Sequence, residues 1–381
     1  MDFLWSSLQQ GLYDQAYSFA SKHIELMNGS ILFNKELLKE QWKICAKFGL
    51  TGGCIEKEYN GKAWDPLTTA YIFESFAHAG VDRGLLFSIA AHLFACVVPV
   101  AKYASQEVKK TILPELCNGN LIGANAMTED QAGSDAFALA TTAHYIENEY
   151  VITGVKSYIT NGSIADFILV YAKTAPNKGH WGISCFLVQT TNQGIVQEEP
   201  FEKIGLNSAP ASKVHFNNCK VSSSYRLGSE GEGAAIFNYS MQWERACLFA
   251  IYLGMMQRQL DMTIEFAKKR KQFGKNLSSQ PLVLNQIAQM KLRLETSRLL
   301  LYKACWKLAQ GQDAKLDIAL SKLSISEAVI QSSLDAVHLH GALGIKTSAG
   351  IERMLRDALP ATILSGTTEM MSYLIAMELG L

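Results

Sequence analysis

The chain has 381 residues, of which 48% are hydrophobic and 10% aromatic, and this suits a globular protein of two or three domains with a large core. Lys and Arg together number 35, as do Asp and Glu, so the formal net charge is zero. This balance argues against nucleic acid as a partner, because nucleic-acid-binding proteins usually carry a basic excess.

The eight cysteines are scattered along the chain without any CxxC pair. Such spacing fits neither a zinc site nor a small disulfide framework, and it indicates reduced thiols in a cytoplasmic protein. The first residues, MDFLWSSLQQGLYDQ, have an acid at position 2 and no basic region, so we expect no signal peptide. His338 and His340 would lie on different faces of a helix, and we therefore expect no metal site.

Residues 1–120 are expected to be helical, because runs such as FNKELLKEQWKICAKFGL repeat apolar positions three and four apart. Within them, GLLFSIAAHLFACVVPVA (84–101) carries no charge over 18 positions, close to the length of a membrane span. Ser88, His92 and Pro99 interrupt this run and no second span exists, so we interpret it as a buried core helix and expect no membrane partner. His92 is either a satisfied core residue or a pocket residue, and the role of Tyr252 is equally open.

Residues 121–230 are expected to form a sheet, because ADFILVYAKT, WGISCFLVQT and KVHFNNCKV are short β-rich segments with turns between them. The pair Asn161-Gly162 predicts a two-residue β-hairpin. GSEGEG (228–233) is interpreted as a loop at a domain boundary that needs no ligand.

Residues 231–381 are expected to be helical again, with Gly311 as the end of the helix in QIAQMKLRLETSRLLLYKACWKLAQG. Helices, then a sheet, then helices predict an α+β fold of segregated layers, because alternating βαβ units would mix the two element types. The sequence has no GxGxxG after an early strand, no GxxxxGK[ST] and no HExxH, which argues against a Rossmann or P-loop site.

The segment YSMQWERACLFAIYLGMM (239–256) places Glu244 and Arg245 at the head of a run that is uncharged from Ala246 to Met256. A carboxylate in such surroundings is costly unless a neighbour compensates it. Glu244 is therefore either one half of a structural ion pair or a catalytic acid/base with a raised pKa.

Four stretches resemble, in this order, the acyl-CoA dehydrogenase family of flavoproteins. They are NAMTEDQAGSD (125–135), KSYITNG (156–162), RKQFGK (270–275) and IERMLRD…ILSGTTEM (351–370). The resemblance covers nearly the whole chain and implies a helical domain over 1–120, a β-sandwich or barrel domain over 121–230 and a four-helix bundle over 231–381. It also implies FAD as the cofactor and a homotetramer, since family members share FAD contacts across a subunit interface.

The resemblance assigns roles to individual residues. Tyr158 stands where the family usually has the Trp that stacks on the flavin, and Thr160 would hydrogen-bond the flavin edge. Arg270 would bind the diphosphate of a neighbouring subunit's FAD through its paired N–H donors. The full set of implied cofactor contacts is Met127, Thr128, Gly133, Ser134, Tyr158, Thr160, Arg270, Gln272, Phe273, His338, Gly341, Thr367 and Glu369.

The usual position of the family's catalytic glutamate is occupied here by Ser365, whose hydroxyl cannot deprotonate a thioester's α-carbon. A branch of the family, typified by isovaleryl-CoA dehydrogenase, places that glutamate in an ER pair that matches Glu244. The resemblance thus implies Glu244 as the general base, with a pKa raised by desolvation. It leaves Ser365 a part through its backbone N–H, which would bind the thioester carbonyl.

Other stretches, including QWERACLFAIYLGMMQRQLDMTIEFAKKRKQFGK and AAHLFACVVP, are most similar to family members that oxidise L-proline tethered to a carrier protein. This implies FAD-dependent oxidation of an L-prolyl thioester on an acyl or peptidyl carrier protein to a pyrroline or pyrrole carboxyl thioester, in natural-product (alkaloid toxin) biosynthesis. Two alternatives stay open: a short branched-chain acyl-CoA dehydrogenase of the isovaleryl type, and a non-catalytic flavoprotein scaffold that Ser365 would favour.

Overall fold

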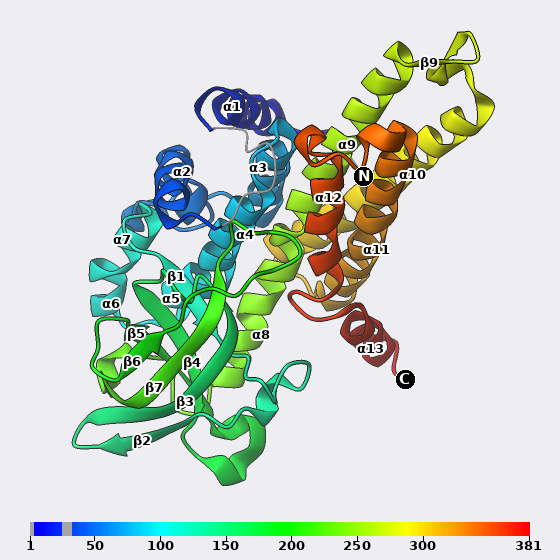
Figure 1. Cartoon of the computed structure of the whole chain (residues 1–381). Coiled ribbons are helices and arrows are strands. Elements are labelled where there is room, and N and C mark those ends of the chain that lie inside the picture. Colours follow the sequence, from blue (N-terminus) through cyan, green and yellow to red (C-terminus); the bar gives the residue numbers. More distant parts are fainter. Residues whose placement is uncertain (1–3, 25–32) are drawn as a thin grey trace.

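The fold consists of helices, then a sheet, then helices, as the α+β prediction requires (Figure 1). The structure is a computed structural model and describes residues 4–24 and 33–381. The first helices are α1 (Ser7–His23), α2 (Lys35–Phe48), α3 (Pro66–Ala79), α4 (Arg83–His92), α5 (Val98–Tyr103), α6 (Gln106–Thr111) and α7 (Leu113–Cys117). Aspartates begin two of them, since Asp65 accepts a hydrogen bond from the Thr68 N–H of α3 and Asp82 accepts one from the Leu85 N–H of α4.

The apolar run of the first part lies inside the protein. Residues Arg83–Tyr103 are long and apolar enough to cross a membrane, yet 89% of their most apolar window is buried. A π-helical turn, Leu93–Val97, joins α4 to α5 within this run. The segment is therefore a buried core helix, as the sequence predicted.

The middle part is one eight-stranded sheet. Its strands are β1 (Gly123–Ala126), β2 (Thr142–Ile146), β3 (Glu149–Thr160), β4 (Phe167–Lys173), β5 (Ile183–Gln189), β6 (Ile195–Gln197), β7 (Ala211–Ser222) and β8 (Arg226–Leu227). They follow the order β6-β7-β3-β2-β4-β5-β8, with β1 parallel to β4. The α4–α5 segment lies against β1, so this strand meets the helices.

The predicted hairpin at Asn161-Gly162 is wrong. β3 pairs with β2 and β7, whereas β4 pairs with β1, β2 and β5, so the two strands on either side of Asn161-Gly162 are not hydrogen-bonded to each other. Asn161 has a positive φ of 65°, as a turn residue can, but its side chain is used for tertiary contact. Its Nδ2 donates to the Ser88 carbonyl at 3.0 Å, which fixes the end of β3 against α4.

The last part of the chain, from α8 onwards, is helical. Its helices are α8 (Gly233–Trp243), α9 (Ala250–Lys269), α10 (Pro281–Ala309), α11 (Lys315–His340), α12 (Ile351–Ala358) and α13 (Thr368–Glu378). A second π-helical turn, Glu244–Leu248, joins α8 to α9. α10 ends two residues before Gly311, whose φ is +65°, which confirms the predicted stop. A small hairpin of β9 (Lys271–Gln272) and β10 (Lys275–Asn276) projects from the far end of α9 and α10 (Figure 1).

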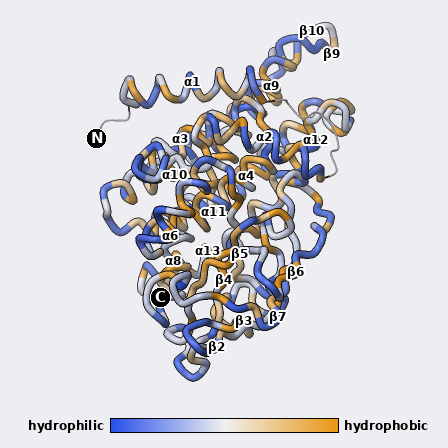
Figure 2. Tube along the Cα trace, turned by 90° about the vertical axis from the view of Figure 1, so that its left-hand side faces the viewer, coloured by the Kyte–Doolittle hydropathy of each residue, from blue (hydrophilic) through white to orange (hydrophobic). Residues whose placement is uncertain are grey.

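One large core joins the N-terminal helices, one face of the sheet and the C-terminal helices, and a second, smaller core lies within the sheet. Figure 2 shows the hydrophobic segments concentrated towards the middle of the molecule, where α3, α4 and α11 lie. The residues of both cores are at most 9% exposed. Burial of this extent fixes the helices relative to the sheet edge where the candidate site lies.

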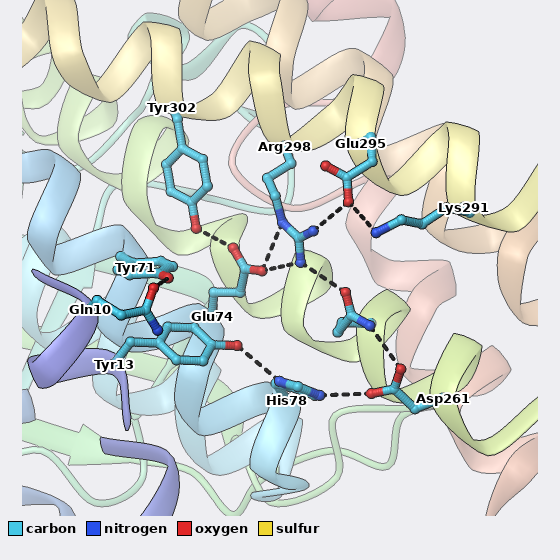
Figure 3. A network of polar contacts seen from close by, with 11 residues as sticks. Gln10, Tyr13, Tyr71, Glu74, His78, Asp261, Lys291, Glu295, Arg298 and Tyr302 are labelled. Carbon is cyan, nitrogen blue, oxygen red and sulfur yellow. Dashed lines mark hydrogen bonds and ion pairs between the residues drawn. The ribbon is translucent and has the colours of Figure 1, made fainter. Parts of the chain in front are cut away.

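A buried polar network also ties α3 to α10 (Figure 3). The Glu74 carboxylate, with a side chain 1% exposed, accepts from Arg298 Nε at 3.0 Å and from the Tyr302 hydroxyl. Nearby, the His78 ring lies between the Tyr13 hydroxyl at 2.9 Å and the Asp261 carboxylate at 2.8 Å. Buried charges are tolerated where they are paired and hydrogen-bonded in this way.

Candidate active site

A cavity of about 480 Å³ lies where the sheet edge, α4, α8 and the chain before α13 meet, within the roughly 300–1,000 Å³ range of ligand pockets. Nine of the residues assigned from the sequence line it. They are Met127, Thr128, Gly133, Ser134, Tyr158, Thr160, Glu244, Ser365 and Thr367. These residues are spread over more than 200 positions of sequence, and the fold brings them to one place.

Both π-helical turns contribute to the cavity wall. Ala95 comes from the turn between α4 and α5, and Glu244 and Arg245 come from the turn between α8 and α9. A π-helical turn inserts one residue into a helix and changes the direction of the side chains around it, and such turns are frequent at functional sites. Glu244, as the first residue of its turn, faces the cavity although the helix continues into the core.

Glu244 is 8% exposed, and burial raises the pKa of its carboxyl above the ordinary value, against smaller opposing effects of the Ser365 hydroxyl and Arg245. The Ser365 hydroxyl donates a hydrogen bond to Glu244 Oε1. Within residues 4–24 and 33–381, no Glu244–Arg245 ion pair is formed. The hydrogen-bond partner of the Glu244 carboxyl is therefore the neutral Ser365 hydroxyl, and Arg245 acts on that carboxyl only through space.

Arg245 acts on the backbone beside Glu244. Its Nε donates to the Ser365 carbonyl at 2.8 Å, and its guanidinium lies against Gly366. Ser365 has a φ of +57°, which is uncommon for a residue with a side chain, and Gly366 follows with a φ of +97°. Among the described residues, no acceptor bonds to the Ser365 N–H. That N–H is free for a ligand in the cavity.

The loop after β1 is fixed from behind by a buried ion pair that sequence reasoning missed. Lys156 Nζ donates to the Met127 carbonyl at 3.0 Å and to Glu129 Oε1 at 2.9 Å. Burial lowers the pKa of Lys156 to about 8, against the raising effect of Glu129. Burial raises the pKa of Glu129, but Lys156 and three hydrogen bonds from Ala140 and Thr141 outweigh it, so the net direction is down.

Tyr158 and Thr160 stand near the end of β3, on a rigid strand. β3 is irregular between Lys156 and Ile159, and Tyr158 has a φ of +60° there. The irregularity turns the Tyr158 ring outwards, so it is 60% exposed and lies edge-on to Phe201 at 5.6 Å between ring centroids. Thr160 pairs with Ala211 of β7, which holds its side chain at the cavity.

The remaining assigned residues do not reach this cavity within one chain. Arg270, Gln272 and Phe273 lie at the projecting β9–β10 hairpin, and Phe273 is 95% exposed. His338 and Gly341 lie exposed at the end of α11, and Glu369 is exposed in the first turn of α13. Their assigned role in a neighbouring subunit's FAD site stays a prediction.

Two residues left open by the sequence lie outside the cavity lining. His92 is fully buried, its Nδ1 accepts from the Gly123 N–H at 2.8 Å, and its Nε2 lies 3.2 Å from the Leu116 carbonyl. His92 is thus a satisfied core residue, and burial lowers its pKa to about 4. Tyr252 is buried in α9 beside Phe249. Within the described ranges, no group of three or more His, Cys, Asp or Glu residues could hold a metal ion.

The cavity fits the flavin end of FAD. An exposed aromatic ring, Tyr158, and a hydroxyl, Thr160, stand on one side. Beside Gly133 the space is open, with no heavy atom within 4 Å of the position a Cβ would take. A flat heterocycle with hydrogen-bonding edges suits such an arrangement of ring, hydroxyl and open backbone.

Three segments match family models. Residues 6–120 match the N-terminal domain of acyl-CoA dehydrogenase, 124–219 the middle domain and 231–380 the C-terminal domain. The chain belongs to the acyl-CoA dehydrogenase family. Membership accounts for the order of helices, sheet and helices.

Within the family, the chain is similar to proteins named for carrier-bound proline. It is 47% identical to an L-prolyl-peptidyl-carrier-protein dehydrogenase of Pseudomonas fluorescens, with 90% of each chain covered. It is 42% identical to a protein of the same name from a Serratia species, over 100% of this chain and 99% of the other. A solved structure of PigA with FAD and proline has a TM-score of 0.94 at 40% identity, covering 100% of this chain and 99% of that one.

Proposed function

We propose that this chain is an FAD-dependent dehydrogenase or oxidase of L-prolyl thioesters carried on the phosphopantetheine arm of an acyl or peptidyl carrier protein, acting in natural-product biosynthesis. The product is a pyrroline or pyrrole carboxyl thioester. The observation that carries the proposal is Glu244, a buried carboxyl of raised pKa that faces the cavity and bonds to Ser365. It stands in a chain 47% and 42% identical to the two prolyl-carrier dehydrogenases.

In this proposal Glu244 removes the α-proton of the prolyl thioester. A base works best when its pKa lies near the working pH, and burial moves the pKa of Glu244 in that direction. The free N–H of Ser365 donates to the thioester oxygen, where negative charge develops as the proton leaves. Arg245 holds that N–H in place through the Ser365 carbonyl.

Met127, Thr128, Tyr158 and Thr160 would hold the flavin ring, with the buried Lys156 fixing the loop behind it. When bound, FAD accepts the hydride that leaves the substrate. Thr367 and the open space beside Gly133 also lie on the cavity and would accept the remaining cofactor and the pantetheine arm.

We further propose a cytoplasmic homotetramer in which Arg270 and Phe273 bind a neighbour's FAD. The eight thiols are free, which suits a reducing compartment. The exposed Phe273 ring suits a contact with another subunit. Co-expression of Arg270→Ala with Glu244→Gln tests this: neither variant alone turns over, but mixed tetramers regain activity if Arg270 serves a site whose Glu244 lies on another chain. Inactive mixed tetramers would count against the shared site.

The substrate is tested by anaerobic bleaching of the bound flavin. We expect prolyl-loaded carrier protein to bleach the wild-type protein and isovaleryl-CoA to leave it yellow. Bleaching by isovaleryl-CoA alone would assign the chain to branched acyl-CoA substrates. A flavoprotein that neither compound bleaches would be a non-catalytic scaffold.

A further inference from the structure

One polar side chain of the cavity has no part in the chemistry proposed above. Asn125 lies on β1, where alternate residues Ala124 and Ala126 face the inner core of the sheet and Asn125 faces the helices. Its neighbours on that wall of the cavity are the apolar Ala91 of α4 and Ala95 of the π-helical turn. A polar group in apolar surroundings is costly unless it is hydrogen-bonded, so its amide needs an explanation.

The orientation of the Asn125 amide is fixed. Its Nδ2 donates to the Ala95 carbonyl at 2.7 Å. A carbonyl can only accept, so the amide nitrogen must point at Ala95 and the Oδ1 must point away from it. Ala95 lies in the π-helical turn just before Pro99, which has no N–H to donate. The Asn125 amide supplies a donor to the Ala95 carbonyl.

The Asn125 Oδ1 is left as an acceptor in the cavity. Within the described part of the chain, no donor bonds to it, and it is not buried away from the cavity. Two carboxylates of the lining are already engaged. Glu129 accepts from Lys156 and from the loop behind it, and Asp130 pairs with Lys213 at 2.6 Å. Asn125 therefore presents a pre-oriented oxygen to whatever enters between α4 and β1.

We infer that Asn125 selects the substrate by accepting a hydrogen bond from the ring nitrogen of the prolyl group. This rests on the proposed function and names the residue that gives it specificity. The secondary amine of the ring carries at least one N–H whether or not it is protonated. A carbocycle or branched acyl chain of similar shape has no such donor, and binding it would strip water from Oδ1 without replacement. Sites built this way reject the analogue that lacks the polar group.

The test compares two thioesters on the same carrier protein, prolyl and cyclopentanecarbonyl, which differ at the ring nitrogen. We expect anaerobic flavin reduction in the wild type to favour prolyl by roughly 10- to 100-fold in kcat/KM. Asn125→Leu keeps the size and removes the acceptor, so its ratio should fall to near one. Binding of the two thioesters to Glu244→Gln and to the Glu244→Gln/Asn125→Leu double variant should show the same change without turnover.

Tyr171→Phe is the matched control. The Tyr171 hydroxyl lies 3.5 Å from Asn125 Nδ2 and is buried behind the cavity, so its removal leaves Oδ1 in place. The ratio between the two thioesters should stay at the wild-type value in this variant, even if both rates change.

Each other outcome decides against the inference. If Asn125→Leu lowers both substrates equally, Asn125 serves only to bond the Ala95 carbonyl. If the wild type shows the same kcat/KM for both thioesters, the inference is refuted. This result needs no variant, so the test stands even if Asn125→Leu does not fold. If the wild type reduces its flavin with isovaleryl-CoA and with neither ring thioester, the proposed function has failed and the inference with it.

Discussion

The buried Lys156–Glu129 pair gives the most direct prediction about stability. Lys156 is 0% exposed, and it joins the strand that carries Tyr158 to the loop that carries Met127. Lys156→Met keeps the length of the side chain and removes its charge. Glu129 is then left in the interior without its cation, and the Met127 carbonyl loses its donor.

The size of the effect follows from what remains around Glu129. Removing one partner of a buried ion pair costs about 3–5 kcal/mol. Glu129 keeps its hydrogen bonds from the Ala140 N–H and from the N–H and hydroxyl of Thr141, so we expect the lower value, about 3 kcal/mol. With an unfolding entropy of about 2.1 cal/mol/K per residue, 381 residues unfolding as one unit would show a Tm lower by about 4 °C.

Differential scanning calorimetry measures this shift, with Lys220→Met as the control. Lys220 lies 4.0 Å from Glu149 at the surface of the same sheet, with side chains 70% and 44% exposed. Such pairs contribute about 0–1 kcal/mol, so the control should lose about 1 °C or less. The ratio of FAD to protein should also fall in Lys156→Met and not in Lys220→Met. Equal small shifts in both variants would refute the reasoning.

Three further outcomes are expected. Because the Ser365 hydroxyl lowers the pKa of Glu244, Ser365→Ala should move the acid limb of the pH dependence of flavin reduction to higher pH, and an unmoved limb would deny the hydrogen bond a role. Burial raises the pKa of Glu244 above its unfolded value of 4.5, so the wild type loses stability as the pH rises between the unfolded and folded values. Glu244→Gln should therefore melt higher than wild type above the folded pKa and alike below 4.5, and a pH-independent difference in Tm would contradict this. Arg298→Met, which leaves buried Glu74 without a cation, should cost about 3–5 kcal/mol, more than Tyr302→Phe, which removes one hydrogen bond worth about 1–3 kcal/mol; denaturation of both variants checks the ranking.

The fold could be predicted from the sequence because its signals are local. The spacing of apolar residues predicted the helices on either side of the sheet. Gly311 predicted the end of α10, because glycine adopts the positive φ found there. Whether Asn161-Gly162 forms a hairpin could not be decided from the neighbouring residues alone. The same dipeptide suits any turn with positive φ, and the contact of Asn161 with Ser88, 73 residues away, decides where the chain goes.

The candidate site was predicted as a set of residues and not as an arrangement. The family resemblance placed Glu244 and Ser365 as alternative positions of one base, and the structure shows them hydrogen-bonded to each other over 121 residues of sequence. Lys156 and Glu129 both lie within stretches that resemble the family. Their pairing could not be predicted, because a contact between residues 27 positions apart follows no helix or strand periodicity. The best signal of this ion pair in the sequence was Lys156 itself, a charged residue on the strand that leads to Tyr158.

Anaerobic titration with prolyl-loaded carrier protein, comparing wild type with Glu244→Gln, tests the central claim most directly. The substitution keeps the size of the side chain and removes its basicity, so it separates proton removal from substrate binding. We predict that the wild-type flavin bleaches and that the variant stays yellow while still binding the thioester. Bleaching of both proteins at similar rates would contradict the account, because the α-proton would then leave through another group.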